Sequence, residues 1–148
     1  MGIIHAYQSI VDCKKRILVV EDNVGSRQLL ALVLGRSGYD IAEAATGLDA
    51  VEQAHATRPD LIIMDLGLPG ITGDEATARL KADASTRDIP VIVNTAFHRE
   101  SLRVERAIAA GAAMILYKPT SLKVFEEVAR RFLSPDYALA ASSTGASQ

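Results

Sequence analysis

Carboxylates stand at the ends of two short apolar runs in this sequence, and an ammonium group follows a third. Asp65 closes the run LIIMD, Glu21 and Asp22 follow RILVV directly, and Lys118 follows MILY. Carboxylates that meet in space repel one another and raise each other's pKa unless a cation lies among them. Oxygen donors of this kind suit Mg²⁺, which keeps several waters and takes a phosphate oxygen at a remaining position. Phosphate chemistry at a divalent metal is therefore the first hypothesis.

The chain between residues 16 and 133 alternates apolar runs with segments of helical periodicity, such as the one carrying Leu29, Leu30, Val33 and Leu34. Strands are predicted at 16–20, 39–45, 61–65, 90–96 and 114–119, and helices at 26–38, 47–60, 74–85, 99–111 and 120–133. Continuous apolar strands are typical of a parallel sheet with helices on both faces. The sequence therefore predicts the α/β class, with a doubly wound, five-stranded parallel sheet.

The carboxyl ends of the predicted strands are the places to look for a site, because open parallel sheets bind their ligands there. The fourth run ends near Thr95 and Ala96. One edge of the sheet would then gather three acids, one hydroxyl and one ammonium group.

From about Arg16 to Leu133, the chain resembles the receiver domain of two-component response regulators. The resemblance rests on EDN at 21–23, DLGLPGITG at 65–73, NTA at 94–96 and YKP at 117–119, in the family's order and at strand ends. Each motif alone is common in ordinary turns, whereas the four together are specific. The resemblance implies a flavodoxin-like (βα)5 fold with strand order 2-1-3-4-5.

The resemblance also implies a role for each motif residue. Asp65 would accept a phosphoryl group from a phosphohistidine, and Mg²⁺ (or Mn²⁺) would be held by Glu21, Asp22, Asp65 and the backbone carbonyl of Gly67. The phosphoryl group would be contacted by Lys118, Thr95 and the backbone of Leu66 and Ala96. The protein would thus be a phosphoacceptor in signalling rather than an enzyme, with self-phosphorylation and slow self-dephosphorylation at most.

The expected partners follow from the same resemblance: a sensor histidine kinase or a histidine phosphotransfer protein, and a downstream target protein. The target would bind the surface of the fourth helix, fifth strand and fifth helix, with a cationic rim of Arg99, Arg103, Arg106 and Lys123. A monomer or weak homodimer is expected. Residues 1–15 form an N-terminal extension, either helical or frayed, and 134–148 a flexible tail too short for an output domain, so a stand-alone receiver is expected.

Composition argues against several other classes of protein. The formal net charge of −2 gives no excess of basic residues of the kind that nucleic-acid binding requires. Cys13 is the single cysteine, no signal peptide is recognisable, and no apolar run approaches the roughly 18 residues of a membrane span. A soluble protein of the cytoplasm is expected.

One position departs from the family pattern, and two others are expected to tune the chemistry of the site. Many receivers carry an aromatic switch residue where this chain has Ile115. Tyr117 shares the face of Ile115 along the strand, so it could replace that aromatic, or it could simply pack under the last helix. Gly67 and Phe97 are expected to flank the path of water to the acceptor.

Four other functions are alternatives to a kinase-driven receiver. A haloacid-dehalogenase phosphatase needs a second Asp where Gly67 stands. A flavodoxin-like cofactor carrier needs a hydroxyl- and Gly-rich phosphate loop where the chain has Glu21 and Asp22. A pseudo-receiver that acts without phosphorylation, or a relay that passes phosphate to a histidine phosphotransfer protein, stays open.

Overall fold

The computed structural model of the chain describes residues 14–134. Most of the predicted N-terminal extension (1–13) and nearly all of the predicted tail (135–148) lie outside these residues. Within residues 14–134, no helix combines the length and the apolar character needed to cross a membrane.

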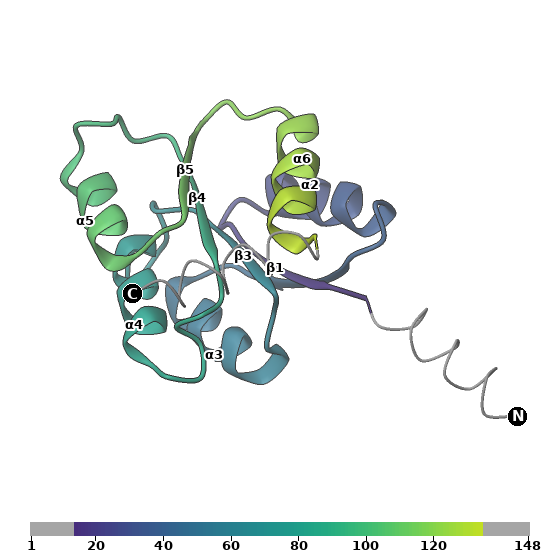
Figure 1. The fold of residues 1–148 in the computed structure, drawn as a ribbon. Coiled ribbons are helices and arrows are strands. Elements are labelled where there is room, and N and C mark those ends of the chain that lie inside the picture. The colour runs from purple at the N-terminus through teal and green to yellow at the C-terminus, as the bar shows by residue number, and fades with distance from the viewer. Residues whose placement is uncertain (1–13, 135–148) are drawn as a thin grey trace, which may run out of the picture.

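A five-stranded parallel sheet forms the centre of the molecule (Figure 1). Its strands are β1 (Arg16–Val20), β2 (Asp40–Ala44), β3 (Leu61–Met64), β4 (Val91–Thr95) and β5 (Met114–Tyr117). They lie in the order β2-β1-β3-β4-β5, which confirms the predicted order. The central strand β3 is buried along its whole length, as the uninterrupted apolar run LIIM predicts.

Helices cover both faces of the sheet. They are α2 (Val24–Arg36), α3 (Gly47–Thr57), α4 (Gly73–Ala82), α5 (Leu102–Ala110) and α6 (Leu122–Leu133). Helices α2 and α6 lie on one face, and α3, α4 and α5 lie on the other (Figure 1). Each face has its own apolar core, so the sheet separates two packed layers. This confirms the doubly wound prediction.

Local capping sets where the helices begin. Helix α2 starts two residues earlier than predicted because the Asn23 side chain accepts a hydrogen bond from the Ser26 backbone N–H. The Ser121 hydroxyl caps α6 in the same way, through the N–H of Val124. These caps place each helix directly after the loop that carries the motif residues.

Helix α2 buries a narrower stripe than the sequence predicted. Leu30 and Leu34 are buried against the sheet, whereas Leu29 is 49% exposed. Residues four apart share a helix face, but neighbours point about 100° apart, so Leu29 turns away from the core. Leu29, which shares the helical spacing of Leu30 and Leu34, is therefore not part of the core, and α2 presents apolar side chains to solvent.

Candidate phosphoacceptor and metal site

Three strands deliver the charged side chains of the site to one edge of the sheet. The backbone N–H of Asp65 donates to Val20, that of Glu21 to Ala44, and that of Lys118 to Thr95. These hydrogen bonds continue the parallel ladders one residue past the strands. The backbone at each charged residue is therefore held by the neighbouring strand.

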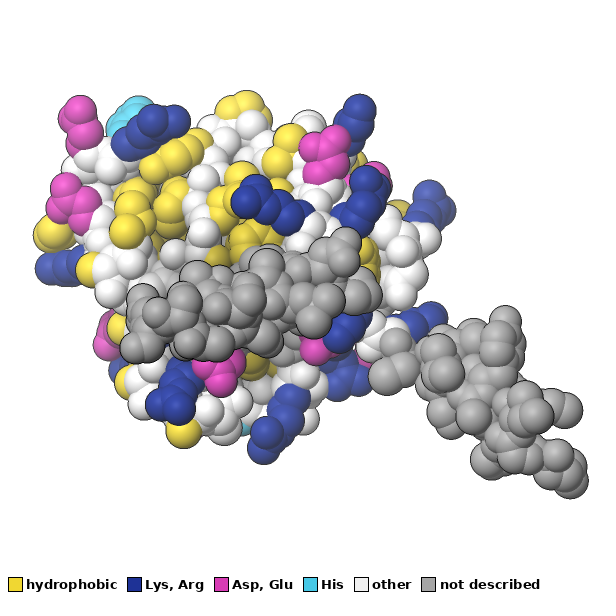
Figure 2. Space-filling model, in the orientation of Figure 1, with side chains coloured by type: hydrophobic (Ala, Val, Ile, Leu, Met, Phe, Trp, Pro, Cys, Tyr) yellow, Lys and Arg dark blue, Asp and Glu magenta, His cyan; other side chains and the backbone are white. Residues whose placement is uncertain are grey.

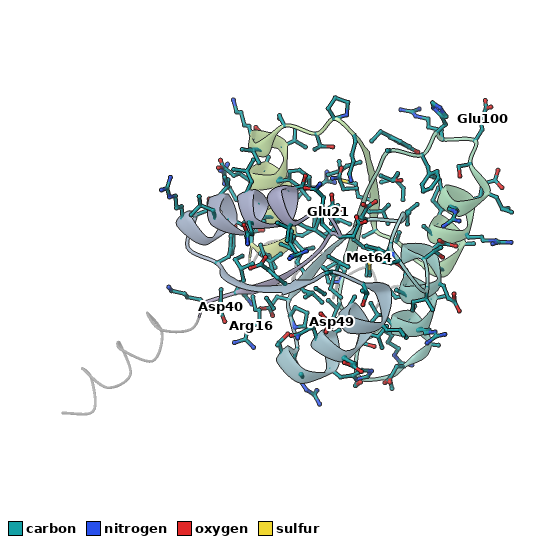
Figure 3. The ribbon with its side chains drawn as sticks, turned by 180° about the vertical axis from the view of Figure 1, so that it is seen from behind. Arg16, Glu21, Asp40, Asp49, Met64 and Glu100 are labelled. Carbon is teal, nitrogen blue, oxygen red and sulfur yellow. The ribbon has the colours of Figure 1, made fainter. Side chains whose placement is uncertain are left out.

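Viewed from behind, Glu21 lies at the same edge of the sheet as Met64, the last residue of β3 (Figure 3). Arg16 and Asp40, the first residues of β1 and β2, mark the opposite edge, where their side chains form a 2.7 Å ion pair. The acids of the motifs thus lie where the carboxyl ends of the strands meet.

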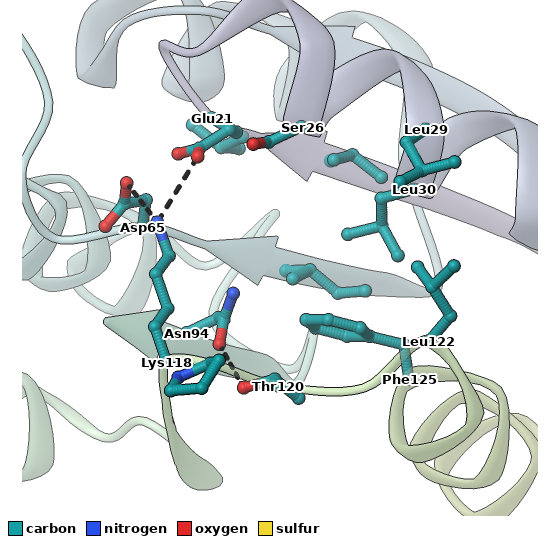
Figure 4. Close-up of a pocket in the computed structure, with 14 residues that line it drawn as sticks. Glu21, Ser26, Leu29, Leu30, Asp65, Asn94, Lys118, Thr120, Leu122 and Phe125 are labelled. Carbon is teal, nitrogen blue, oxygen red and sulfur yellow. Dashed lines mark hydrogen bonds and ion pairs between the residues drawn. The ribbon is translucent and has the colours of Figure 1, made fainter. Parts of the chain in front are cut away.

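Lys118 bridges two carboxylates. Its Nζ lies 3.1 Å from Oδ2 of Asp65 and 3.2 Å from Oε1 of Glu21 (Figure 4). The side chains of Asp65 and Glu21 are each only 12% exposed. The Gly67 backbone N–H donates to the other oxygen of Asp65, at 3.3 Å. Asp65 is therefore held from both sides in an orientation toward the loops.

The acids have the donor set that a hard divalent cation requires. One carboxylate oxygen from each of Glu21, Asp22 and Asp65 lies within 4.8 Å of the others. Oε2 of Glu21 is buried and has no hydrogen-bond partner among residues 14–134. A buried anionic oxygen without a donor is costly, and a metal ion would satisfy it. The side chains present thus fit Mg²⁺.

The pKa values of the two buried carboxyl groups, Glu21 and Asp65, are shifted in opposite directions. Burial, followed by hydrogen bonding with Asp65, raises the pKa of Glu21 to about 7. Burial also opposes ionisation of Asp65, but hydrogen bonding with Glu21 and the charge of Lys118 outweigh it and lower the pKa of Asp65. For Lys118, the two carboxylates outweigh burial and raise its pKa. Asp65 is therefore the acid that stays ionised.

Thr95 ends β4 beside this cluster. It is fully buried, and its Oγ1 accepts a hydrogen bond of 3.0 Å from the Phe97 backbone N–H. The Phe97 ring lies near Gly67, with Cε2 3.7 Å from where a Cβ on Gly67 would stand. The pair predicted to flank the water path thus lies side by side.

Leu66 and Ala96 are the residues whose backbone is expected to contact the phosphoryl group. Ala96 is exposed. The Leu66 carbonyl accepts hydrogen bonds from the backbone N–H groups of Leu68 and Gly73.

Gly70 and Gly73, in the loop that leads from Asp65 into α4, are required for different structural reasons. Gly70 provides the positive φ of that loop, at 76°, whereas Gly73 starts α4 against the acceptor's own backbone. A Cβ on Gly73 would lie 2.0 Å from the Asp65 carbonyl oxygen. Only glycine allows this approach, which seats the first turn of α4 directly on Asp65.

Tyr117 does not pack under the last helix, so that reading is wrong. Both Tyr117 and Ile115 pack against the apolar cluster beneath α3, α4 and α5, because alternate residues of a strand share a face. The Arg99 guanidinium lies 5.4 Å from the centroid of the Tyr117 ring. That Tyr117 takes the role of the aromatic residue missing at Ile115 therefore stays a prediction.

A cavity of about 370 Å³ opens beside the acids, between α2 and α6 (Figure 4). Leu29, Leu30, Leu122 and Phe125 form apolar parts of its wall. The Thr120 hydroxyl donates to Oδ1 of Asn94 at 2.8 Å along the wall. The sequence reasoning missed this cavity, although Asn94 and Thr120 adjoin the NTA and YKP motifs.

Comparison with known proteins agrees with this geometry. A family model for the response regulator receiver domain matches residues 17–130. The polar-differentiation response regulator DivK of Brucella anthropi is 38% identical over 119 residues, which cover 80% of this chain and 96% of that protein.

Solved structures with the same fold include two bacterial receivers. The chemotaxis protein CheY4 of Vibrio cholerae aligns with a TM-score of 0.75 and 26% identity, over 82% of this chain and 100% of that one. The receiver domain of the sensor histidine kinase PA1611 from Pseudomonas aeruginosa aligns with a TM-score of 0.74 and 31% identity, over 81% and 98%. That structure holds a magnesium ion coordinated in its active-site cleft.

Proposed function

The chain belongs to the response regulator receiver domains of two-component signalling, and from this premise we propose that Asp65 accepts a phosphoryl group in the presence of Mg²⁺. The observation that carries the proposal is the cluster of Asp65, Glu21 and Lys118, with an ionised acceptor held at hydrogen-bond distance from an ammonium group. The group would come from a phosphohistidine of a sensor kinase or histidine phosphotransfer protein.

Transfer forms a bond between an Asp65 oxygen and phosphorus while the phosphorus–nitrogen bond of the donor breaks and the imidazole nitrogen keeps the electron pair. Lys118, 3.1 Å from Oδ2 of Asp65, neutralises negative charge on the moving group. Mg²⁺, when bound by Glu21, Asp22, Asp65 and the Gly67 carbonyl, would offset the remaining charge. Little else is required, because such reactions depend on positioning and electrostatics.

Thr95 would respond to phosphorylation of Asp65 by binding the phosphoryl group. Its Oγ1 accepts from Phe97 N–H, but its hydroxyl donates to no acceptor among the described residues. The hydroxyl proton is thus available for a phosphoryl oxygen, and the backbone N–H groups of Leu66 and Ala96 would contact the same group. If the Thr95 side chain turned toward the phosphoryl group, its hydrogen bond from the Phe97 backbone N–H would break, and the loop that leads to α5 would change.

The apolar outer side of α2 offers a surface for the phosphodonor. Val24 is 56% exposed, Leu29 49% and Leu32 52%, and Leu29 also lines the cavity beside the acids. A helix carrying the donor histidine could cover these side chains while its imidazole reaches Asp65. This would place the protein in the same compartment as the catalytic part of its kinase, the cytoplasm.

A second surface, between α5 and α6, could bind the target. Hydrophobic side chains gather between α5 and α6, and Lys and Arg side chains lie among and around them (Figure 2). Leu102 and Ile108 of α5 are each more than half exposed. Patches that combine apolar and cationic groups are typical of protein interfaces.

The test is intact mass after incubation with Mg²⁺ and acetyl phosphate. We expect one phosphoryl mass on the unchanged chain, none on Asp65→Asn, and none after chelation of the metal. Asp60→Asn is the matched control, because Asp60 is an exposed acid at the opposite edge, where it accepts from the Arg16 N–H. If the unchanged chain gains no mass while binding Mg²⁺, the pseudo-receiver hypothesis replaces this one.

A further inference from the structure

Asp74, in the first turn of α4, is buried without a partner for one of its oxygens. The residue is 6% exposed, and its Oδ1 has no hydrogen-bond partner among residues 14–134. No ion pair of the described residues includes it. The position near a helix N-terminus favours negative charge only weakly, and this does not offset the cost of burying an unpaired carboxylate. The carboxylate thus lacks a cation.

A groove of about 460 Å³ lies beside Asp74, between α4 and α5. Its walls are formed by Thr72, Asp74, Glu75 and Ala78 on one side and by Arg106, Ala109 and Ala110 on the other. The acid at its mouth, Glu75, is already paired with Arg79 at 3.2 Å. Arg106 is exposed and forms no ion pair with any described residue. The groove therefore has one unpaired anion and one unpaired cation on facing walls.

We propose that Arg106 pairs with Asp74 in a second arrangement of α5, in which the groove is closed, and that phosphorylation of Asp65 favours this arrangement. The inference rests on the proposed function, since the phosphoryl group is what selects the closed form. The alanines at 78, 109 and 110 contribute only small side chains to the walls of the groove, so these positions do not oppose closure. The ion pair would supply the donor that Oδ1 of Asp74 lacks.

The contacts around Asp65 indicate which helix moves. Helix α4 is seated on the acceptor, because Gly73 lies directly against the Asp65 carbonyl. Helix α5 is tied to the site through the Phe97 N–H, which donates to Oγ1 of Thr95. When that hydroxyl turns to the phosphoryl group, the loop before α5 loses this bond. Helix α5 is then the element free to close on α4.

The test measures the affinity of the protein for beryllium fluoride, a phosphoryl mimic, in the presence of saturating Mg²⁺. If the ion pair forms only when beryllium fluoride is bound, the free energy of the pair adds to the affinity for beryllium fluoride. We expect Asp74→Asn and Arg106→Gln each to weaken binding about three- to tenfold. The double variant is expected to be no weaker than either single one, because both changes remove the same pair.

The matched control is the ion pair between Arg16 and Asp40, which lies at the opposite edge of the sheet, outside the groove. Arg16→Gln and Asp40→Asn should leave the affinity for the mimic unchanged. Affinities of the Asp74 and Arg106 variants equal to that of the unchanged chain, or additive losses in the double variant, would overturn the ion pair. Failure of the unchanged chain to bind the mimic would overturn the proposed function as well, so the two failures are distinguishable.

Discussion

If Mg²⁺ binds as proposed, Glu21 is the acid whose proton would limit metal binding. Its pKa is raised to about 7, mainly by burial and by hydrogen bonding with Asp65. Below that pH the folded protein holds a proton on Glu21, and a metal ion must displace it. Taken alone, Glu21 also lowers the free energy of unfolding of the metal-free protein as pH rises from 4.5, the ordinary pKa of a Glu side chain, to about 7. The reason is that the folded state binds this proton more tightly than the unfolded state does.

We therefore expect the affinity for Mg²⁺ to fall as pH drops below 7, by at most about tenfold per pH unit, and to level off at higher pH. Calorimetric titration with Mg²⁺ between pH 5.5 and 8.5 measures this. Glu21→Gln should bind Mg²⁺ more weakly and lose the pH dependence in this range. A flat profile for the unchanged chain between pH 6 and 8 would contradict the assignment.

Lys118 is expected to matter more for transfer than for metal binding. Lys118→Gln removes the cation that Asp65 and Glu21 share, so negative charge on the moving phosphoryl group loses its fixed partner. Phosphorylation by acetyl phosphate should slow about a hundredfold, the usual loss for one preorganised electrostatic contact. Initial rates from intact mass measure this. Lys123→Gln, at an exposed position of α6, should react at the normal rate.

At the scale of elements, the contact between α4 and β3 makes one glycine indispensable. In Gly73→Ala the new Cβ would overlap the Asp65 carbonyl, so either α4 or the acceptor must shift. We expect a loss of about 2 kcal/mol or more in the free energy of unfolding, with weaker Mg²⁺ binding, as overpacking costs about 1–3 kcal/mol. Denaturant titration and calorimetry measure the two effects.

Gly35→Ala, within α2, is the matched control for that substitution. Its Cβ would meet only the Ile41 side chain, at 3.8 Å, which is ordinary contact. Since alanine favours helix by about 1 kcal/mol over glycine, this variant should be as stable as the parent or more so. Equal losses for both variants would show that the contact with Asp65 is not the cause.

The elements also show what a sequence can and cannot predict. The strand order and the gathering of Glu21, Asp65 and Lys118 at one edge could be predicted, because apolar runs and motif positions are local signals. The exposure of Leu29 could not, because it depends on which stripe of α2 meets the sheet. The partnerless oxygen of Asp74 and the closeness of Gly73 to Asp65 arise only when α4 is packed against its neighbours.

For the whole molecule, metal binding and folding should be linked. The acids of the site come from the ends of two strands and gather only in the folded chain, so Mg²⁺, held as proposed, would bind the native state preferentially. At about 100 times its dissociation constant, Mg²⁺ should raise the free energy of unfolding by about 2.7 kcal/mol and Tm by about 10 °C. Asp22→Asn should show a clearly smaller shift in thermal scans.

The longest-range contact of the site has a consequence for protein synthesis. Lys118 reaches Glu21 across 97 positions of the chain, and β5, which precedes Lys118, is the last strand to leave the ribosome. A nascent chain that has emerged only through β4 already carries both acids but lacks the cation between them. Under the proposed function, competence to accept a phosphoryl group would therefore be acquired late, and a chain truncated before Lys118 would keep the acceptor residue but lack its ammonium partner.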